Sequence, residues 1–221
     1  IYTLSLHDAL PIWQLAIEYA ALFEGLLPAL VRMGVPIPLG GTSNHFRTAL
    51  LRRAGAWDAW NVTEDADLGI RLARFGFITG VIGSTTSEEA PFRFKGWLHQ
   101  RTRWLKGWMQ TAIVHTRHPV MAMRETGVLR ALGIVTVMGG IILSALLHPL
   151  FTAILIAGAI EGAPLGVPQT FIGHGLSWVA LGNLTAGYAS SMALAMLVLV
   201  RRRAWRLVPH VLLVPLYWQV I

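Results

Sequence analysis

A long apolar stretch, residues 128–160, limits the possible folds of this chain more than any other feature. It carries charge only near its start, and it exceeds the roughly 20 residues that a helix needs to cross a bilayer. Pro149 lies inside it, so one tilted helix and a kinked helix are both compatible with the sequence. Residues 174–200 form a second apolar stretch, and residues 207–221 open a third. We therefore expect residues 128–221 to be a region of transmembrane α-helices, with two spans and a truncated third.

Basic side chains lie beside these stretches on one side only. They are Arg117, Arg124, Arg130, Arg201, Arg202, Arg203 and Arg206. The segment 161–173, rich in glycine and proline, connects the first two stretches and has no lysine or arginine. Because basic residues collect on the cytoplasmic side of a membrane, we expect 161–173 to be an external loop. The sequence thus predicts a multi-pass protein of the inner or plasma membrane whose preceding part is cytoplasmic.

The composition favours a membrane protein with a peripheral domain. Hydrophobic residues make up 54% and charged residues 13% of the chain, whereas about 25% charged residues is typical of soluble domains. Eighteen basic residues against 11 acidic ones give a net charge of +7, and the basic residues are mostly arginines. Arginine suits bidentate phosphate binding and the edges of membranes. The basic excess by itself is compatible with nucleic acid, anionic lipid or a phosphate-bearing substrate. Of these we expect membrane lipids and a phosphate-bearing substrate as partners, and no nucleic acid. The chain has no cysteine, so disulfides are excluded.

Residues 1–12 resemble a sequencing-library adapter translated in one frame. They lack the basic flank and the long apolar core of a signal peptide, and no initiating methionine is present. We interpret them as an artefact at the cut front of a reading frame, so His7 and Asp8 receive no functional weight. The peripheral domain is then expected over residues 13–127.

Three carboxylates fall within four positions at Glu64, Asp65 and Asp67. Thr63 precedes them as a candidate N-cap, and negative charge is favourable in the first turn of a helix, so a well-capped helix is one interpretation. A second cluster, Gln100-Arg101-Thr102-Arg103-Trp104, follows along the chain. The first cluster offers a base, and the second offers cations with an aromatic face.

Thr63-Glu64-Asp65 and Gln100–Trp104 resemble the TED and Q(Q/R)xRW motifs of membrane-bound family 2 glycosyltransferases, such as cellulose, hyaluronan and poly-N-acetylglucosamine synthases. Their order, followed at once by membrane-spanning sequence, strengthens the resemblance, which covers residues 13–221. It implies an α/β fold class: the C-terminal, acceptor half of a GT-A-like domain, mostly helical here, followed by transmembrane α-helices. It also implies inverting transfer of a sugar from a nucleotide sugar, a UDP-sugar, to a growing polysaccharide.

The resemblance assigns roles to particular residues. The catalytic residues that it implies are Thr63, Glu64 and Asp65, with Asp65 as the base. The substrate-binding residues that it implies are Gln100, Arg101, Arg103, Trp104, Ser43 and Asn44. A guanidinium matches diphosphate oxygens in a fork, which suits Arg103 and Arg101, while Trp104 would stack on the acceptor sugar and Gln100 would bond nearby. Ser43 and Asn44 follow the Gly40-Gly41 pair, where a backbone can approach a ligand closely or simply turn between two elements.

The remaining elements are expected from local pattern. Residues 13–33 have the periodicity of a packing helix, with a kink or break near Pro28. The other expected elements are a short helix from Thr48 ending near Gly55, a strand at residues 77–84, and an amphipathic interfacial helix at residues 97–111. Trp57 and Trp60 are expected in the core, with an acceptor-facing position as the alternative.

The family's metal site is missing from this sequence. Relatives hold a divalent metal, Mg or Mn, through an Asp-x-Asp that precedes the TED motif, and no such site precedes Thr63. Asp65-Ala66-Asp67 matches the Asp-x-Asp pattern, but its first aspartate already belongs to the TED-like motif. We expect the metal and nucleotide ligands to lie upstream, in lost sequence, so that this fragment alone is inactive.

Two other functions remain open. A non-processive transferase would glycosylate a lipid acceptor instead of a polysaccharide. A non-enzymatic polytopic membrane protein with a basic arm would explain the apolar stretches and the arginines, but it leaves the two polar clusters unexplained.

Overall fold

The structure, a computed structural model, describes residues 10–41, 43–86, 88, 90–91, 93–160, 162 and 171–220. Most of the adapter-like segment 1–12 lies outside these residues. The chain divides into two compact units: residues 10–12 with 22–142, and residues 13–21 with 143–220. The expected boundary at residue 128 falls inside the first unit, because α7 begins there and continues into the second.

The N-terminal helical run is long and apolar enough to cross a membrane, over residues 12–32. It consists of α1 (Leu10–Ala20), a π-helical segment (Ala21–Leu26) and α2 (Leu27–Arg32). Pro28 cannot donate to the carbonyl one turn earlier, which accounts for the wider π-helical turns before it. The expected irregularity is therefore present but precedes the proline, and the expected packing helix is also a candidate membrane span.

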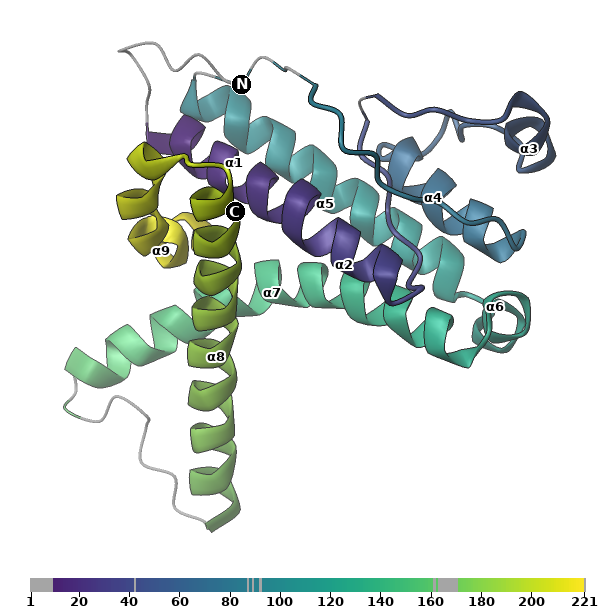
Figure 1. Cartoon of the computed structure of the whole chain (residues 1–221). Helices are drawn as coiled ribbons and strands as arrows, with labels where there is room; N and C mark the ends of the chain where they lie inside the picture. The colour runs from purple at the N-terminus through teal and green to yellow at the C-terminus, as the bar shows by residue number, and fades with distance from the viewer. Residues whose placement is uncertain are drawn as a thin grey trace. The chain divides into compact units, whose positions relative to one another are not determined.

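Helices of the first unit carry both polar motifs. They are α3 (Thr48–Arg53), α4 (Glu64–Arg74), α5 (Phe94–Thr116) and α6 (Pro119–Thr126). The helix α4 packs against both α5 and α6, and Figure 1 shows α4 beside α5 with α6 at the end of α5. Leu68 and Leu72 of α4 form one small core with Ala54. The end of α3 before Gly55 matches the sequence prediction, and Gly55 has φ +82°.

The prediction of a strand at residues 77–84 is wrong, because the described part of the chain contains no strand. Its β-branched residues Ile78, Val81 and Ile82 are instead exposed on an irregular segment. A strand needs a neighbouring strand to pair its backbone groups, and the described residues offer none. The α/β fold class is therefore not confirmed, and the described structure is helical.

The second unit contains the C-terminal helices. They are the last part of α7 (Val128–Ile160), α8 (Phe171–Arg201), a 3-10 helix (Trp205–Leu213) and α9 (Val214–Trp218). Both α7 and α8 are long and apolar enough to span a membrane, and α7 is one helix with Pro149 inside it. Most of the expected external loop 161–173 lies outside the described residues.

The third span expected from residue 207 onward is not seen. The described residues there form the 3-10 helix and the short α9, which pack on α8. Val211 and Val214 share a buried core with Leu199 of α8. Pro209 and Pro215 each remove a backbone donor, so an unbroken helix is disfavoured here.

Candidate active site

The TED-like motif lies at the start of α4. Thr63 occupies the N-cap position as expected, but its hydroxyl does not cap the helix. Instead Asn61 Oδ1 accepts hydrogen bonds from the Thr63 backbone N–H (3.0 Å) and from the Thr63 hydroxyl (3.5 Å). Asp65 Oδ1 accepts from the Ala66 N–H at 2.7 Å. The motif is thus held by its own backbone and by Asn61.

Three residues of α5 at a spacing of four contact the start of α4. At Gly107 an added Cβ would lie 2.5 Å from Thr63 Cγ2 and Oγ1, so the two backbones meet closely. One turn on, Thr111 Oγ1 accepts from Asn61 Nδ2 at 2.8 Å. A further turn on, His115 contacts Asp67. Because residues i, i+4 and i+8 share one helix face, a single edge of α5 holds the whole motif.

The segment 37–41, which contains the Gly40-Gly41 pair, runs along another part of α4. A Cβ at Gly69 would lie 2.5 Å from the carbonyl oxygen of Ile37 and 2.9 Å from the backbone nitrogen of Leu39. A Cβ at Gly41 would lie 3.3 Å from Asp65 Oδ2. Since Asp65 and Gly69 are one turn apart, the segment follows α4 and brings Gly41 beside the proposed base.

Ser43 and Asn44 face a hollow of about 410 Å³ in the first unit, which residues 45–47, 77–80 and 82 also line. The Ser43 hydroxyl shares a 2.6 Å hydrogen bond with the Thr86 hydroxyl, and Asn44 Nδ2 donates to the Gly40 carbonyl. These two side chains therefore shape the loop, and their role toward a substrate stays a prediction.

The second motif lies on the N-terminal half of α5. Arg101 is buried, and its guanidinium carbon is 4.9 Å from the Trp104 ring centre and 5.7 Å from that of Trp97. This placement gives Arg101 a cation–π role in packing, beside the diphosphate-binding role expected of it. Arg103 is exposed, and its charge acts on Asp65. Gln100 is half-buried, and its Oε1 accepts no hydrogen bond from the described residues.

Trp57 and Trp60 are not core residues, which corrects the preferred expectation. Trp57 is half exposed, with its ring edge against Phe46 (centroids 5.6 Å apart), and Trp60 is 89% exposed. The backbone of Trp60 is held from α5, because Gln110 Nε2 donates to its carbonyl at 3.0 Å. The alternative expectation, that Trp57 and Trp60 face the acceptor, stays a prediction.

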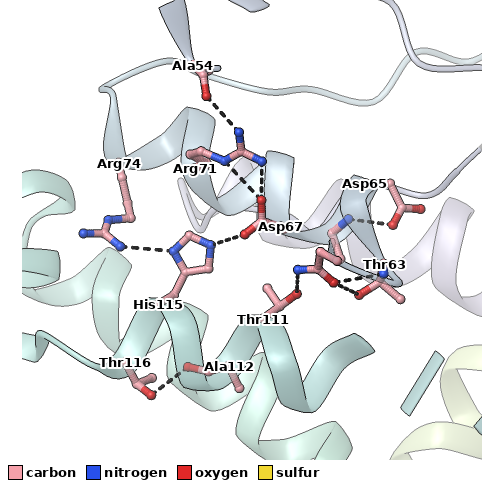
Figure 2. Close-up of polar contacts among 12 residues, drawn as sticks. Ala54, Thr63, Asp65, Asp67, Arg71, Arg74, Thr111, Ala112, His115 and Thr116 are labelled. Carbon is pink, nitrogen blue, oxygen red and sulfur yellow. Dashed lines mark hydrogen bonds and ion pairs between the residues drawn. The ribbon is translucent and has the colours of Figure 1, made fainter. Parts of the chain in front are cut away.

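A buried charge network surrounds Asp67, as Figure 2 shows. Arg71 donates from Nε (3.1 Å) and Nη2 to Asp67 Oδ2, and from Nη1 to the carbonyls of Ala54 (2.9 Å) and Ala56 (2.7 Å). His115 Nε2 bonds Asp67 Oδ1 at 2.8 Å. Asp67 itself is 3% exposed. Both of its oxygens are therefore committed to protein partners.

Asp65 of the motif and Asp67, two positions further on, have opposite electrostatic environments. Burial raises the pKa of Asp65 above its ordinary value, with Glu64 adding to the rise, while the Ala66 N–H and Arg103 oppose it only in part. Burial would also raise the pKa of Asp67, but the hydrogen bonds from His115 and Arg71 outweigh it and lower that pKa. Asp65 is thus suited to taking up a proton, and Asp67 is fixed as an anion.

The described residues do not form a divalent metal site. They contain no group of three or more histidine, aspartate or glutamate side chains that would hold a metal ion. Asp65-Ala66-Asp67 has the Asp-x-Asp spelling, but Asp67 is bound on both oxygens by Arg71 and His115. The described residues thus offer no ligand set for the Mg or Mn that the resemblance implies. The Asp67 carboxylate instead forms an internal ion pair with Arg71 and a hydrogen bond with His115.

Sequence reasoning missed the residues that hold the motif on α5, namely Asn61, Gly107, Thr111 and His115. Their partners are about 50 positions away in the chain, so no local pattern reveals them. One signal was available: a small residue, a hydroxyl and an imidazole repeat at a spacing of four just after the second motif. Such a stripe predicts a helix face that meets a polar partner closely.

Comparison with known proteins agrees with a transferase. Residues 15–221 match the family described as "Glycosyl transferase family group 2", and the chain belongs to this family. Over 68 residues it is 35% identical to "Probable glycosyltransferase YdaM" of Bacillus subtilis (strain 168), a region that covers 30% of this chain and 16% of that protein. No solved structure matches the chain. Membership in this family favours a transferase over a non-catalytic membrane protein.

Proposed function

We propose that the intact protein transfers a sugar, with inversion, from a UDP-sugar to a growing polysaccharide at the cytoplasmic face of the membrane. One observation carries the proposal: Asp65, with a raised pKa and Gly41 beside it, lies in the first turn of α4, and Asn61 just before that helix is bonded to the helix bearing Arg103. A base and a cation are thereby fixed on two packed helices. An acceptor hydroxyl and a leaving diphosphate need this pair of groups.

In the proposed step, the acceptor hydroxyl gives its proton to Asp65 while its oxygen forms a bond to the sugar's anomeric carbon. The bond from that carbon to the diphosphate oxygen breaks, and the electron pair leaves with UDP. Arg103 stabilises the negative charge on the diphosphate. Thr63 and Glu64 position Asp65, while Trp104 and Gln100 bind the acceptor. Attack from the face opposite the leaving group inverts the anomeric centre.

The proposal is tested by supplying radiolabelled UDP-sugars to membranes that contain the intact enzyme and separating the products. Label in a high-molecular-weight glycan supports a polysaccharide acceptor. Label that extracts into organic solvent favours the alternative, a non-processive transferase with a lipid acceptor. The apolar side chains Val120 and Met121, exposed beside Arg117 and Arg124, are compatible with either, because both reactions take place at a membrane.

The roles of Arg103 and Trp104 can be separated by kinetics. Arg103→Lys keeps the charge but loses the fork. A hydrogen bond to a charged group is worth about 1.5–3 kcal/mol, so we expect the rate to fall by about one to two powers of ten and UDP to inhibit more weakly. Trp104→Ala should instead raise the acceptor requirement or shorten the product, with UDP inhibition little changed.

Measuring UDP inhibition and acceptor dependence in well-expressed forms of both variants distinguishes these outcomes. Identical effects on the two quantities would contradict the division of roles. Arg101→Lys is a useful comparison, because its guanidinium lies against the rings of Trp97 and Trp104 and should affect packing before chemistry.

The arginine run after α8 is proposed to be cytoplasmic. The chain has no cysteine, so one introduced cysteine reports its own side of the membrane. We expect Arg203→Cys to react with an impermeant thiol reagent only after cells are opened. Phe171→Cys, exposed at the other end of α8, should react in intact cells. Labelling of position 203 from outside would reverse the orientation.

A further inference from the structure

A chain of polar contacts continues from Asp67 to the surface of the first unit. Arg74 Nη1 bonds His115 Nδ1 at 3.2 Å, and Arg74 Nε donates to Glu125 Oε2 at 2.6 Å. The chain therefore links residues of α4, α5 and α6 through His115, which is itself buried. Nothing in the proposed chemistry uses these groups, and none of them belongs to either motif, Thr63–Asp65 or Gln100–Trp104.

The contacts determine which nitrogen of His115 carries the proton. A guanidinium has donors and no acceptor, so the contact with Arg74 requires Nδ1 to accept. The ring proton must then be on Nε2, where it is donated to Asp67 Oδ1. Both ring nitrogens of His115 thus have a partner, a cation at Nδ1 and an anion at Nε2.

We propose that His115 is a positioning residue that, through Asp67, sets the register of α4 against α5 and so the placement of Asp65 opposite Arg103. This inference rests on the proposed function. Asp67 lies on the same first turn of α4 as Asp65. Arg103 lies on the same helix as His115, about 18 Å along its axis for 12 residues. A contact between Asp67 and His115 therefore connects the helix that carries the base with the helix that carries the cation.

Two separated contacts are needed to fix the orientation of one helix on another. The close approach of Thr63 to Gly107, with the neighbouring Asn61–Thr111 hydrogen bond, supplies the first at the residues just before α4. The bond from His115 to Asp67 supplies the second, two turns further along α5. Hydrogen bonds to a buried charge are directional and costly to leave unmade, so they select one register where apolar packing would accept several.

The test compares two substitutions of His115 in the intact enzyme. His115→Gln keeps one donor and one acceptor, whereas His115→Leu keeps the bulk and removes both. We expect His115→Leu to lower kcat by about 10²-fold, as a displacement of about 1 Å at a reacting group does, with KM for the donor and UDP inhibition little changed. His115→Gln should retain most of the rate. Thr116→Val is the matched control, since the neighbouring Thr116 hydroxyl donates within its own helix, to the Ala112 carbonyl at 2.7 Å.

A second readout measures the register without activity. Spin labels on Phe75→Cys and Lys106→Cys, both exposed positions, report the distance between α4 and α5 in the full chain. His115→Leu should shift or broaden this distance distribution, and His115→Gln should leave it near that of the unsubstituted chain. If His115→Leu does not fold, Asp67→Asn takes its place, because its amide nitrogen would face the Arg71 donors.

The outcomes separate the positioning role from the proposed function. A changed distance distribution in His115→Leu, in an intact protein that transfers no sugar, would support the positioning role and refute the proposed function. An unchanged distance distribution in His115→Leu would overturn the positioning role whatever the activity. Equal losses of kcat in the glutamine and leucine variants, or normal kcat per folded molecule in both, would also overturn it. Nitrogen NMR of the wild type should show Nδ1 unprotonated, and a protonated Nδ1 would contradict the assigned contacts.

Discussion

Asp65→Asn is expected to lower the sugar-transfer rate of the intact enzyme by about 10²–10⁴-fold, the usual effect of losing a general base. Donor binding should survive, because the carboxylate acts on the acceptor hydroxyl. The amide can still accept from the Ala66 N–H, so the first turn of α4 should keep its shape. Donor affinity and single-turnover rate, measured separately, check both parts, and near-normal turnover would remove Asp65 from the mechanism.

The same substitution should not destabilise the protein. Burial raises the pKa of Asp65 in the folded chain, so the folded state binds this proton more tightly than the unfolded state does. The stability contributed by this group is then greatest below the unfolded pKa and falls as the pH rises through the folded pKa. At neutral pH the charged carboxylate opposes folding, and Asp65→Asn removes that cost. Thermal unfolding at pH 7 should show a midpoint equal to or above that of the wild type.

The raised pKa also predicts the acid side of the pH–rate profile. The base must be ionised to act, so activity should be lost on acidification at a pH above the ordinary aspartate range. An acid limb at or below that range would indicate that another group limits the rate.

Elements with a strong local pattern were predictable from the sequence. The span at residues 128–160 coincides with α7, and the short helix ends before Gly55 as expected. Elements whose existence depends on a partner were not. Residues 77–84 have the composition of a strand but no strand to pair with among the described residues, and residues 207–218 have apolar character but are interrupted by two prolines.

The site shows the same division between local and distant information. The two short motifs lie on α4 and α5, whose functional role stays a prediction, and the acidic first turn was predictable at Glu64, Asp65 and Asp67. The role of Asp67 in the buried ion pair was not predictable, because its partner His115 lies 48 positions away. The pattern Asp-x-Asp occurs in metal sites and is equally compatible with a buried ion pair. Burial separates the two readings, and burial is a tertiary property.

Gly69→Ala is expected to destabilise the first unit, against the usual trend. Alanine in a helix interior is about 1 kcal/mol more favourable than glycine. At Gly69, however, the added Cβ would lie 2.5 Å from the Ile37 carbonyl oxygen and 2.9 Å from the Leu39 nitrogen, both backbone atoms. Overpacking of this kind typically costs about 1–3 kcal/mol, so the clash should outweigh the propensity. The thermal unfolding midpoint in detergent measures the balance.

The control for this substitution is Gly96→Ala on α5, where an added Cβ meets no atom within 4 Å. That variant should unfold at or slightly above the wild-type temperature, because only the helix propensity changes. Gly69→Ala should also reduce sugar transfer, since displacing the segment at Ile37 and Leu39 moves Gly41 away from Asp65, where the acceptor is proposed to bind. If Gly69→Ala instead matches Gly96→Ala in both midpoint and rate, the segment does not pack on α4 as the structure places it, and the surroundings of the base must be drawn differently.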